Sequence, residues 1–440
     1  IFLILALIIF IWTPTFCRLI APNFSSRELS LMVNLTRLML LAQLFFIVSN
    51  IFTGMLQSYQ RFLIPALAPV AYNLGIIMGI VFFSSSFGIY GPTIGVVIGA
   101  FLHFIIQLPV VLRLCFTYQP ILSLRDPHVR RIGKLMLPRT LALAVSQIEL
   151  TVAVFIATSL PAGSLTIFYF AQHLNDLPVG LFGLTIGQAA LPVLAVEAAR
   201  NKENFNKFLN ASLREILYLA LPASVLLLVL RIPVVRLAFG ARTFPWEATI
   251  LTGKVVALFA LSIFAQAIIQ ILVRAFYALQ DTKTPFYLAT AVVLLNVVLA
   301  FFLTFQLKLA ILGLALAASL ASIFHALMLL VFLQKKNPFL TLENFFKPLL
   351  KIISATLLTA FALWLPMRLL DRFIFDTTRT VNLIILTAAV SLFGLSVYLL
   401  LSYLMKIEEM RRFLQLLHRF GAWREILGRS QEYLDGRKDD

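Results

Sequence analysis

The chain carries ionisable side chains inside a stretch of sequence that is apolar enough to cross a lipid bilayer. Residues 168–187 read FYFAQHLNDLPVGLFGLTIG, and His173 and Asp176 fall in the first half of this stretch. Because an ionisable group in hydrocarbon costs several kcal/mol, we expect both side chains to face a water-filled cavity or a polar partner. Gln172, Asp176 and the three glycines that follow recur every three or four residues, so they share one face of a helix. A histidine and a carboxylate on or beside such a face could hold an anionic group or relay a proton.

The preceding apolar stretch adds a second group of polar side chains. It reads LPRTLALAVSQIELTVAVF at 137–155 and contains Gln147 and Glu149. Because only a short loop separates the two stretches, we expect them to form antiparallel neighbouring helices. A Glu149–His173 pair and an Asp176–His173 pair are both compatible with this arrangement, and the sequence does not choose between them.

Four further polar residues lie within apolar stretches. Arg37 is near the outer end of its stretch and Lys254 is placed equivalently, so each either faces a cavity or extends its side chain to the outer headgroups. Asn73 and Asn296 are of the type that forms hydrogen bonds between membrane helices. The candidate substrate-binding residues are His173, Asp176, Gln172, Glu149, Gln147, Arg37, Asn73 and Lys254.

The sequence lacks the motifs that are typical of an enzyme. It has no Walker loop, no H-E-x-x-H motif, no paired carboxylates at a membrane surface and no aspartate-rich glycosyltransferase loop. The two cysteines, Cys17 and Cys115, suggest neither a disulfide framework nor a metal site. We therefore expect no catalytic residue, no metal and no cofactor, and a transporter rather than an enzyme. A membrane glycosyltransferase and a transport-inactive scaffold remain as alternatives.

The composition indicates a membrane protein. Of the 440 residues, 61% are hydrophobic and 12% are charged, and the mean hydropathy is +0.96. A soluble protein cannot bury so many apolar side chains, whereas a polytopic membrane protein needs them. The prediction is an all-α polytopic membrane protein with about twelve spans, each near or above the length that crosses hydrocarbon. The predicted spans are 1–20, 31–58, 64–86, 91–114, 137–160, 164–198, 208–238, 248–279, 284–306, 310–333, 345–370 and 381–405.

The formal net charge of +17 would also suit a nucleic-acid-binding protein, but the positions of the basic residues argue for a membrane. If the spans alternate in direction, most Lys and Arg residues fall on one side, which is cytoplasmic by the positive-inside rule. The C-terminus and residue 1 are then both cytoplasmic. We interpret residues 116–136 and the tail 406–440 as basic amphipathic segments that lie on anionic membrane lipids. No nucleic-acid partner is expected.

Short motifs recur along the chain at a nearly constant offset. The Gln-x4-Pro pattern of 60–65 returns at 280–285. Three small residues spaced four apart lead to His103, and the same pattern leads to His325, 222 residues later. Small residues at this spacing let helix backbones approach closely, so we interpret these ladders and both histidines as packing features. Spans one to four thus match spans seven to ten.

Spans five and six have no counterpart unless two helices precede residue 1. We therefore expect a chain that lacks two N-terminal spans, with about twelve present of about fourteen, in two pseudo-symmetric parallel helix bundles plus a C-terminal helix pair. The expected division is 1–115 for the remainder of the N-terminal lobe, 116–136 for the linker, 137–335 for the C-terminal lobe, 336–405 for the helix pair and 406–440 for the tail.

Several segments resemble one known family. AQHLNDLPVGLFG at 171–183, followed by ALPVL at 190–194, resembles the A-x-R-L-x-E/D-x-P-x-G-x-x-G…LP motif of MurJ (MviN) lipid II flippases. The segments 58–73, 135–150 and 274–285 are similar to three more of that family's segments, in the same order. The resemblance implies the fold of the multidrug/oligosaccharidyl-lipid/polysaccharide exporters, in the bacterial inner membrane.

The resemblance also implies a substrate and a mechanism. Members carry lipid II, the undecaprenyl-diphosphate-linked peptidoglycan precursor, from the inner to the outer leaflet by alternating access, and cell-wall synthesis machinery is an implied partner. The C-terminal pair, 345–405, would form a groove for the lipid tail. This sequence has His173 where the motif has Arg and Glu149 where the family usually has Asn, and Glu149 would be a partner that keeps His173 protonated. Another exporter of the same fold, for a polysaccharide lipid or a drug, is the alternative function.

Overall fold

The computed structural model describes residues 2–59, 61, 63–114, 126–240, 244–337, 343–373 and 380–410. All regular secondary structure in these ranges is helical, as the sequence predicts. The chain divides into two compact units, 1–143 and 144–440, with the boundary inside helix α7 (Pro127–Thr158). Residues 116–125 of the predicted linker and 411–440 of the predicted tail lie outside the described residues, and 127–136 belong to α7. The predicted lobe boundaries stay a prediction.

Unit 1 consists of apolar helices that pack through glycines. Its helices are α1 (Phe2–Ile20), α2 (Ser26–Ser58), α3 (Leu63–Met78), η1 (Gly79–Phe83), α4 (Ser84–Phe87), α5 (Tyr90–Ile105), α6 (Leu108–Arg113) and the first part of α7. A Cβ atom on Gly75 of α3 would lie 2.3 Å from the Cα of Gly99 in α5, and one on Gly79 would lie 2.4 Å from the Cα of Gly95. The small-residue ladder therefore serves close helix packing, as predicted.

His103 is also a packing residue. Its side chain is buried, and its Nδ1 lies 2.6 Å from the Oγ of Ser49 in α2. Gln107 donates to Ser49 Oγ at 2.8 Å and accepts from Thr53 at 2.9 Å. These bonds satisfy polar groups that face another helix in an apolar surrounding.

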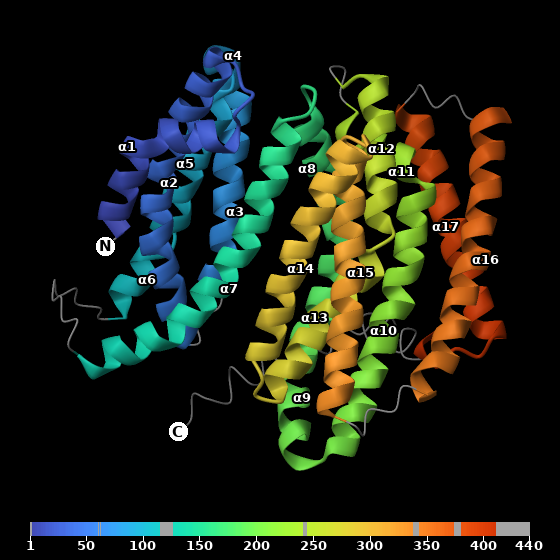
Figure 1. Cartoon of the computed structure of the whole chain (residues 1–440). Coiled ribbons are helices and arrows are strands. Elements are labelled where there is room, and N and C mark those ends of the chain that lie inside the picture. The colour runs from blue at the N-terminus through green and yellow to red at the C-terminus, as the bar shows by residue number, and fades with distance from the viewer. Residues whose placement is uncertain are drawn as a thin grey trace. The chain divides into compact units, whose positions relative to one another are not determined.

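Unit 2 is a bundle of long helices (Figure 1), in which α10 and α13 contact each other and several of the others. Its helices are the rest of α7, α8 (Ser164–Pro178), η2 (Val179–Leu184), α9 (Thr185–Arg200), α10 (Lys202–Val229), α11 (Arg231–Phe239), α12 (Trp246–Ala260), α13 (Ile263–Ala278), α14 (Lys283–Phe301), η3 (Phe302–Gln306), α15 (Ile311–Lys336), α16 (Glu343–Phe373) and α17 (Thr380–Leu404). α13 packs against α9, α10 and α15, and α10 also packs against α16. The main apolar core includes residues of α9, α10, α13 and α15 together with α8 and α12, whereas the buried apolar residues of α16 lie in two smaller clusters.

The long apolar helices agree with the predicted polytopic membrane protein. In the described residues ten helices are long and apolar enough to span a membrane, or eleven if the bent pair α12–α13 is counted as one span. The predicted span 137–160 corresponds to the second part of α7, where Gln147–Thr158 is an apolar helical stretch. The predicted span 208–238 is divided between α10 and α11.

The sequence repeat is visible in the backbone. Both η1 and η3 are π-helical turns, at the ends of α3 and α14. Each is followed by a residue with positive φ, Gly88 at 55° and Ala310 at 49°. The N–H of Gly91 donates to the Gly88 carbonyl, and that of Gly313 donates to the Ala310 carbonyl, both at 3.0 Å. Equivalent positions in the two units thus adopt the same turn.

Candidate functional site

The motif residues lie on one long helix that changes its winding midway. α8, η2 and α9 follow one another without a break, and η2 begins directly after Pro178. Proline lacks the N–H that would continue the hydrogen-bond ladder, which favours a local rearrangement such as this π-helical turn. π-helical turns inside α-helices occur frequently at functional sites.

His173 and Asp176 project from α8 with exposed side chains, and Gln172 is half-buried. The His173 ring stacks on Tyr169, with centroids 6.3 Å apart and planes at 22°. Asp176 lies one turn further along α8, three residues after His173. No ion pair between His173 and either carboxylate is found among the described residues, so the pairing with Asp176 stays a prediction.

Glu149 pairs with a different residue. Its Oε1 accepts a hydrogen bond of 2.6 Å from Nδ2 of Asn296, which is 8% exposed, so Asn296 bonds between helices as predicted. The interpretation of Glu149 as the partner of His173 is wrong for this structure, because its carboxylate is bonded to the amide of α14. Gln147, two residues earlier on α7, is exposed.

The shared face of α8–η2–α9 has two different surroundings. Gly180 has open space beside it, whereas a Cβ atom on Gly183 would lie 2.7 Å from the Cα of Ala267 in α13. A Cβ atom on Gly187 would lie 3.0 Å from Nη1 of Arg274. In the second half of this face the glycines therefore allow α13 to pack closely.

Arg274 is a charged residue of this region that the sequence reasoning counted only as a cytoplasmic basic residue. Its Nη1 donates to the carbonyl of Gln270 and lies 3.3 Å from the Oε1 of that residue. It forms no salt bridge with any residue in the described ranges. Its position near the end of an apolar helix, six residues before the segment QDTKTP, was the available signal.

The remaining candidates differ in their surroundings. Lys254, in unit 2, has an exposed side chain, and so has Asn73, in unit 1. Arg37, also in unit 1, donates from Nε to the carbonyl oxygen of Phe10 at 3.3 Å. Within unit 2 the structure thus groups Gln172, His173 and Asp176 on one helix, with Glu149 bonded separately to α14.

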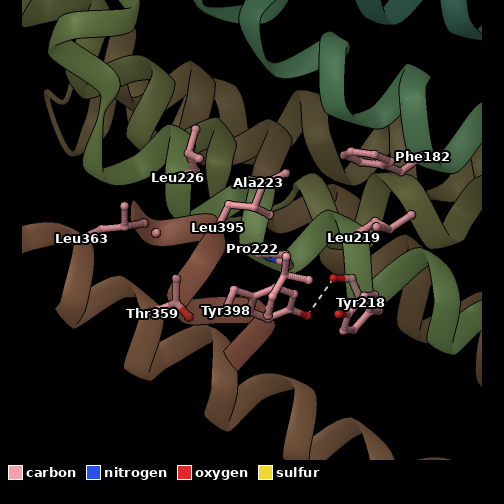
Figure 2. Close-up of a pocket in the computed structure, with 12 residues that line it drawn as sticks. Phe182, Tyr218, Leu219, Pro222, Ala223, Leu226, Thr359, Leu363, Leu395 and Tyr398 are labelled. Carbon is pink, nitrogen blue, oxygen red and sulfur yellow. Dashed lines mark hydrogen bonds between the residues drawn. The ribbon is translucent and has the colours of Figure 1, made fainter. Parts of the chain in front are cut away.

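An apolar cavity of about 250 Å³ lies between α10, α16 and α17. Figure 2 shows side chains of these helices around it, together with Phe182 of η2. One end is formed by Tyr218 and Tyr398, where the Tyr398 hydroxyl donates to the Tyr218 carbonyl at 2.8 Å. The lining residues are Phe182, Tyr218, Leu219, Pro222, Ala223, Leu226, Thr359, Leu363, Gly394, Leu395, Tyr398 and Leu399. The cavity adjoins the C-terminal pair, where the resemblance places a groove for a lipid tail.

A family model described as "Lipid II flippase MurJ" matches residues 1–383. The chain belongs to the MurJ lipid II flippase family. Relatives include the probable lipid II flippase MurJ of Buchnera aphidicola subsp. Acyrthosiphon pisum, 30% identical over 80% of this chain and 69% of the relative. The lipid II flippase MurJ of Burkholderia cenocepacia is 26% identical over 75% of this chain and 65% of the relative. The chain thus spans about two thirds of the length of these relatives.

Solved structures agree with this assignment. A structure titled "Lipid II flippase MurJ, inward closed conformation" has a TM-score of 0.75 and 26% identity, over 91% of this chain and 80% of that one. An inward-facing MATE-family multidrug transporter has a TM-score of 0.65 at 15% identity, over 77% and 80% of the two chains, and shows the fold alone. Family membership makes the chain a multi-pass inner-membrane transporter rather than an enzyme.

Proposed function

We propose that this protein moves lipid II from the inner to the outer leaflet of the bacterial inner membrane by alternating access. The observation that carries the proposal is the chemistry of α8–η2–α9, whose first part presents His173 and Asp176 and whose Phe182 lines the apolar cavity. Lipid II has a diphosphate headgroup region and a long hydrocarbon tail. A single helix with a polar region and a contact to an apolar cavity suits both parts of such a molecule.

The headgroup would be held at the polar part of this helix. A histidine side chain can carry the positive charge that attracts a diphosphate. Asp176 lies one turn away on the same helix and has an exposed side chain, as His173 has. Gln172 offers amide donors and acceptors on the same face. Arginine at position 173 would keep its charge at all relevant pH values and bind two oxygens at once.

The tail would enter the cavity between α10, α16 and α17. Its wall is apolar apart from Thr359 and the two tyrosines, so burying hydrocarbon there is favourable. Tyr218 and Tyr398 have their rings 5.1 Å apart and are almost fully buried. A cavity of about 250 Å³ holds only part of a long polyprenyl chain, so the rest of the tail would remain among membrane lipids.

Site-specific photocrosslinking tests the substrate. A photoreactive amino acid at Leu226, which lines the cavity, is expected to capture labelled lipid II from membranes. The same group at Leu294 of α14, which is 63% exposed and does not line the cavity, is the matched control and should capture far less. Equal capture at both positions would contradict the proposal. Capture of another carrier lipid in competition with lipid II would favour the alternative exporter function.

Complementation tests the headgroup residues. The protein is expressed from its natural gene in cells depleted of their own flippase. We expect His173→Ala and Asp176→Ala each to reduce growth at normal protein level, and His173→Arg to support growth, because arginine supplies a permanent charge. Normal growth with both alanine variants would show that these side chains do not bind the headgroup.

Two further parts of the proposal concern the surroundings of the protein. We place the C-terminus in the cytoplasm because basic residues gather on that side. Anionic lipids are proposed partners of the basic segments for the same electrostatic reason, and cell-wall synthesis machinery is a proposed partner by resemblance. Labelling of Lys406→Cys by a membrane-impermeant maleimide, in intact and opened cells, tests the orientation. Labelling in intact cells would contradict it.

A further inference from the structure

The span formed by α12 and α13 is broken near its middle. The two helices meet at 43°, and the break falls at Leu261 and Ser262. The N–H of Ser262 donates to the Phe259 carbonyl at 2.9 Å, three residues back instead of four. The carbonyl of Leu258 consequently loses the partner that a regular helix would provide, and only Leu261 donates to it from the same span, at 3.3 Å.

A neighbouring helix supplies the missing donor. Ser319 of α15 donates from Oγ to the Leu258 carbonyl at 2.8 Å. Ser262 Oγ lies 3.2 Å from Ser319 Oγ, and both side chains are at most 1% exposed. Freed backbone groups in membrane helices need such partners, because no water is present to replace them.

The same group of bonds extends to the motif helix α8. Asn175 donates from Nδ2 to Gln266 Oε1 at 3.1 Å, and Gln266 donates from Nε2 to Ser262 Oγ at 2.9 Å. Asn175 is 2% exposed and directly precedes Asp176. A continuous chain of hydrogen bonds therefore joins the polar part of α8 to the break and to α15.

One member of this chain is incompletely bonded. The Oδ1 atom of Asn175 is buried and has no hydrogen-bond partner among the described residues. A buried polar network with an unsatisfied member is less stable than a complete one. A rotation of α8, or a different angle at the break, can therefore exchange one set of bonds for another at small net cost.

We propose that the break between α12 and α13 is a hinge, and that Asn175 and Ser319 are positioning residues that couple its angle to the headgroup end of α8. A ligand that moves His173 or Asp176 would move Asn175, and through Gln266 it would change the bonds that hold Ser262. Hinges of this kind convert small shifts at a site into rigid-body movement. The inference rests on the proposed transport function for its ligand, although the hinge can be tested without transport.

Spin labels on the two arms test the hinge. Trp246 at the start of α12 and Tyr277 near the end of α13 are 57% and 44% exposed, so both accept a label after replacement by cysteine in a protein without Cys17 and Cys115. We measure the label-to-label distance distribution of the full protein in lipid nanodiscs, with and without lipid II. For the reference protein we expect a distribution that shifts when lipid II is added.

Ser319→Ala and Asn175→Leu are expected to broaden the distribution without ligand and to abolish the shift. Ser322→Ala is the matched control, because Ser322 lies one turn away on α15 and bonds only the Ala318 carbonyl of its own helix. Ser319→Thr keeps the hydroxyl and should restore the reference behaviour. If Asn175→Leu does not fold, Asn175→Ser replaces it.

Unchanged distributions in Ser319→Ala and in the Asn175 variant would overturn the hinge proposal. Broadening by Ser322→Ala as strong as that by Ser319→Ala would also overturn it, because a general loosening of α15 would then explain the effect. Failure of lipid II to crosslink at Leu226 would overturn the transport proposal alone, since broadening without ligand depends only on the hinge.

Discussion

The Nε atom of Arg37 lies 3.3 Å from the carbonyl oxygen of Phe10, the acceptor that Pro14 leaves free in helix α1. A proline has no N–H for the carbonyl four residues before it, so this oxygen needs another donor. Thr13 also donates to it, at 3.1 Å, and the guanidinium of Arg37 lies 4.9 Å from the Phe10 ring centre. Arg37 therefore joins α2 to the proline site of α1. Its predicted role in substrate binding stays a prediction.

A double-mutant cycle tests whether this contact stabilises unit 1. We expect Arg37→Met to lower the free energy of unfolding by ~1 kcal/mol, because the Phe10 carbonyl loses a charged donor and keeps only the hydroxyl of Thr13. In a Pro14→Ala background the helix can bond the Phe10 carbonyl itself, so the same substitution should cost clearly less. The measurement is thermal unfolding of the four proteins in detergent. Equal costs in both backgrounds would mean that Arg37 acts independently of Pro14.

The repeated turn predicts a stabilising substitution. Ala310 adopts φ 49° and ψ −132°, a conformation that Gly88 adopts at the equivalent place with φ 55° and ψ −129°. A side chain is strained at such angles and glycine is not. Ala310→Gly should therefore raise the unfolding free energy by ~1 kcal/mol and increase the melting temperature. Gly88→Ala should have the opposite effect, and a lower melting temperature with Ala310→Gly would contradict the argument.

The apolar stretches and the repeat were readable from the sequence because both are local or periodic. Helix positions follow from runs of apolar residues, and the shared turn of Gly88 and Ala310 follows the offset that relates His103 to His325. The bend between α12 and α13 was not readable, because both helices fall within one continuous apolar stretch.

The partners of the polar residues were not readable from the sequence. Glu149 and Asn296 are 147 positions apart, and Asn175 and Gln266 are 91 apart, so helix packing alone brings them together. The pairing of Glu149 with His173 was one of two possibilities because the two helices are consecutive, but Glu149 accepts its hydrogen bond from Asn296 of α14. The bond of Arg37 to Phe10 was not readable either, because the acceptor lies 27 positions away in another helix.

The glycines of the motif predict opposite effects at neighbouring positions. Gly183→Ala would bring a methyl group within 2.7 Å of the Ala267 backbone, so we expect the unfolding free energy to fall by ~2 kcal/mol through overpacking. Gly180 has open space beside it. Gly180→Ala should therefore leave the unfolding free energy unchanged or raise it, because alanine favours helix. Thermal unfolding in detergent measures both. If Gly180→Ala destabilises as much as Gly183→Ala, close packing on α13 is not the reason for Gly183.

Asp281 predicts a pH-dependent contribution to stability. Its carboxylate forms a salt bridge with Lys336, which is 42% exposed, and accepts hydrogen bonds from the N–H groups of Lys283 and Thr284 at the start of α14. Burial alone would raise the pKa of Asp281, but the bonds from Lys336 and Thr284 outweigh it and hold the pKa well below its usual range. The charged form is therefore favoured in the folded state. The stabilisation by this carboxylate is present above the pKa of about 3.9 that aspartate has in the unfolded chain. It is lost as the pH falls toward the lower pKa of Asp281 in the folded protein.

Asp281→Asn isolates this charge, because asparagine can still accept the two backbone hydrogen bonds. We expect the variant to be less stable by ~1.5 kcal/mol at pH 7, a low figure because water screens the exposed lysine. The difference from the unchanged protein should shrink as the pH falls below about 4. The control is Glu203→Gln, whose salt bridge with Lys207 is exposed at both ends and should contribute little at any pH. The melting temperatures of Asp281→Asn and of the unchanged protein are measured between pH 3 and pH 7. If the difference between them stays constant over this range, the charge of Asp281 does not stabilise the fold.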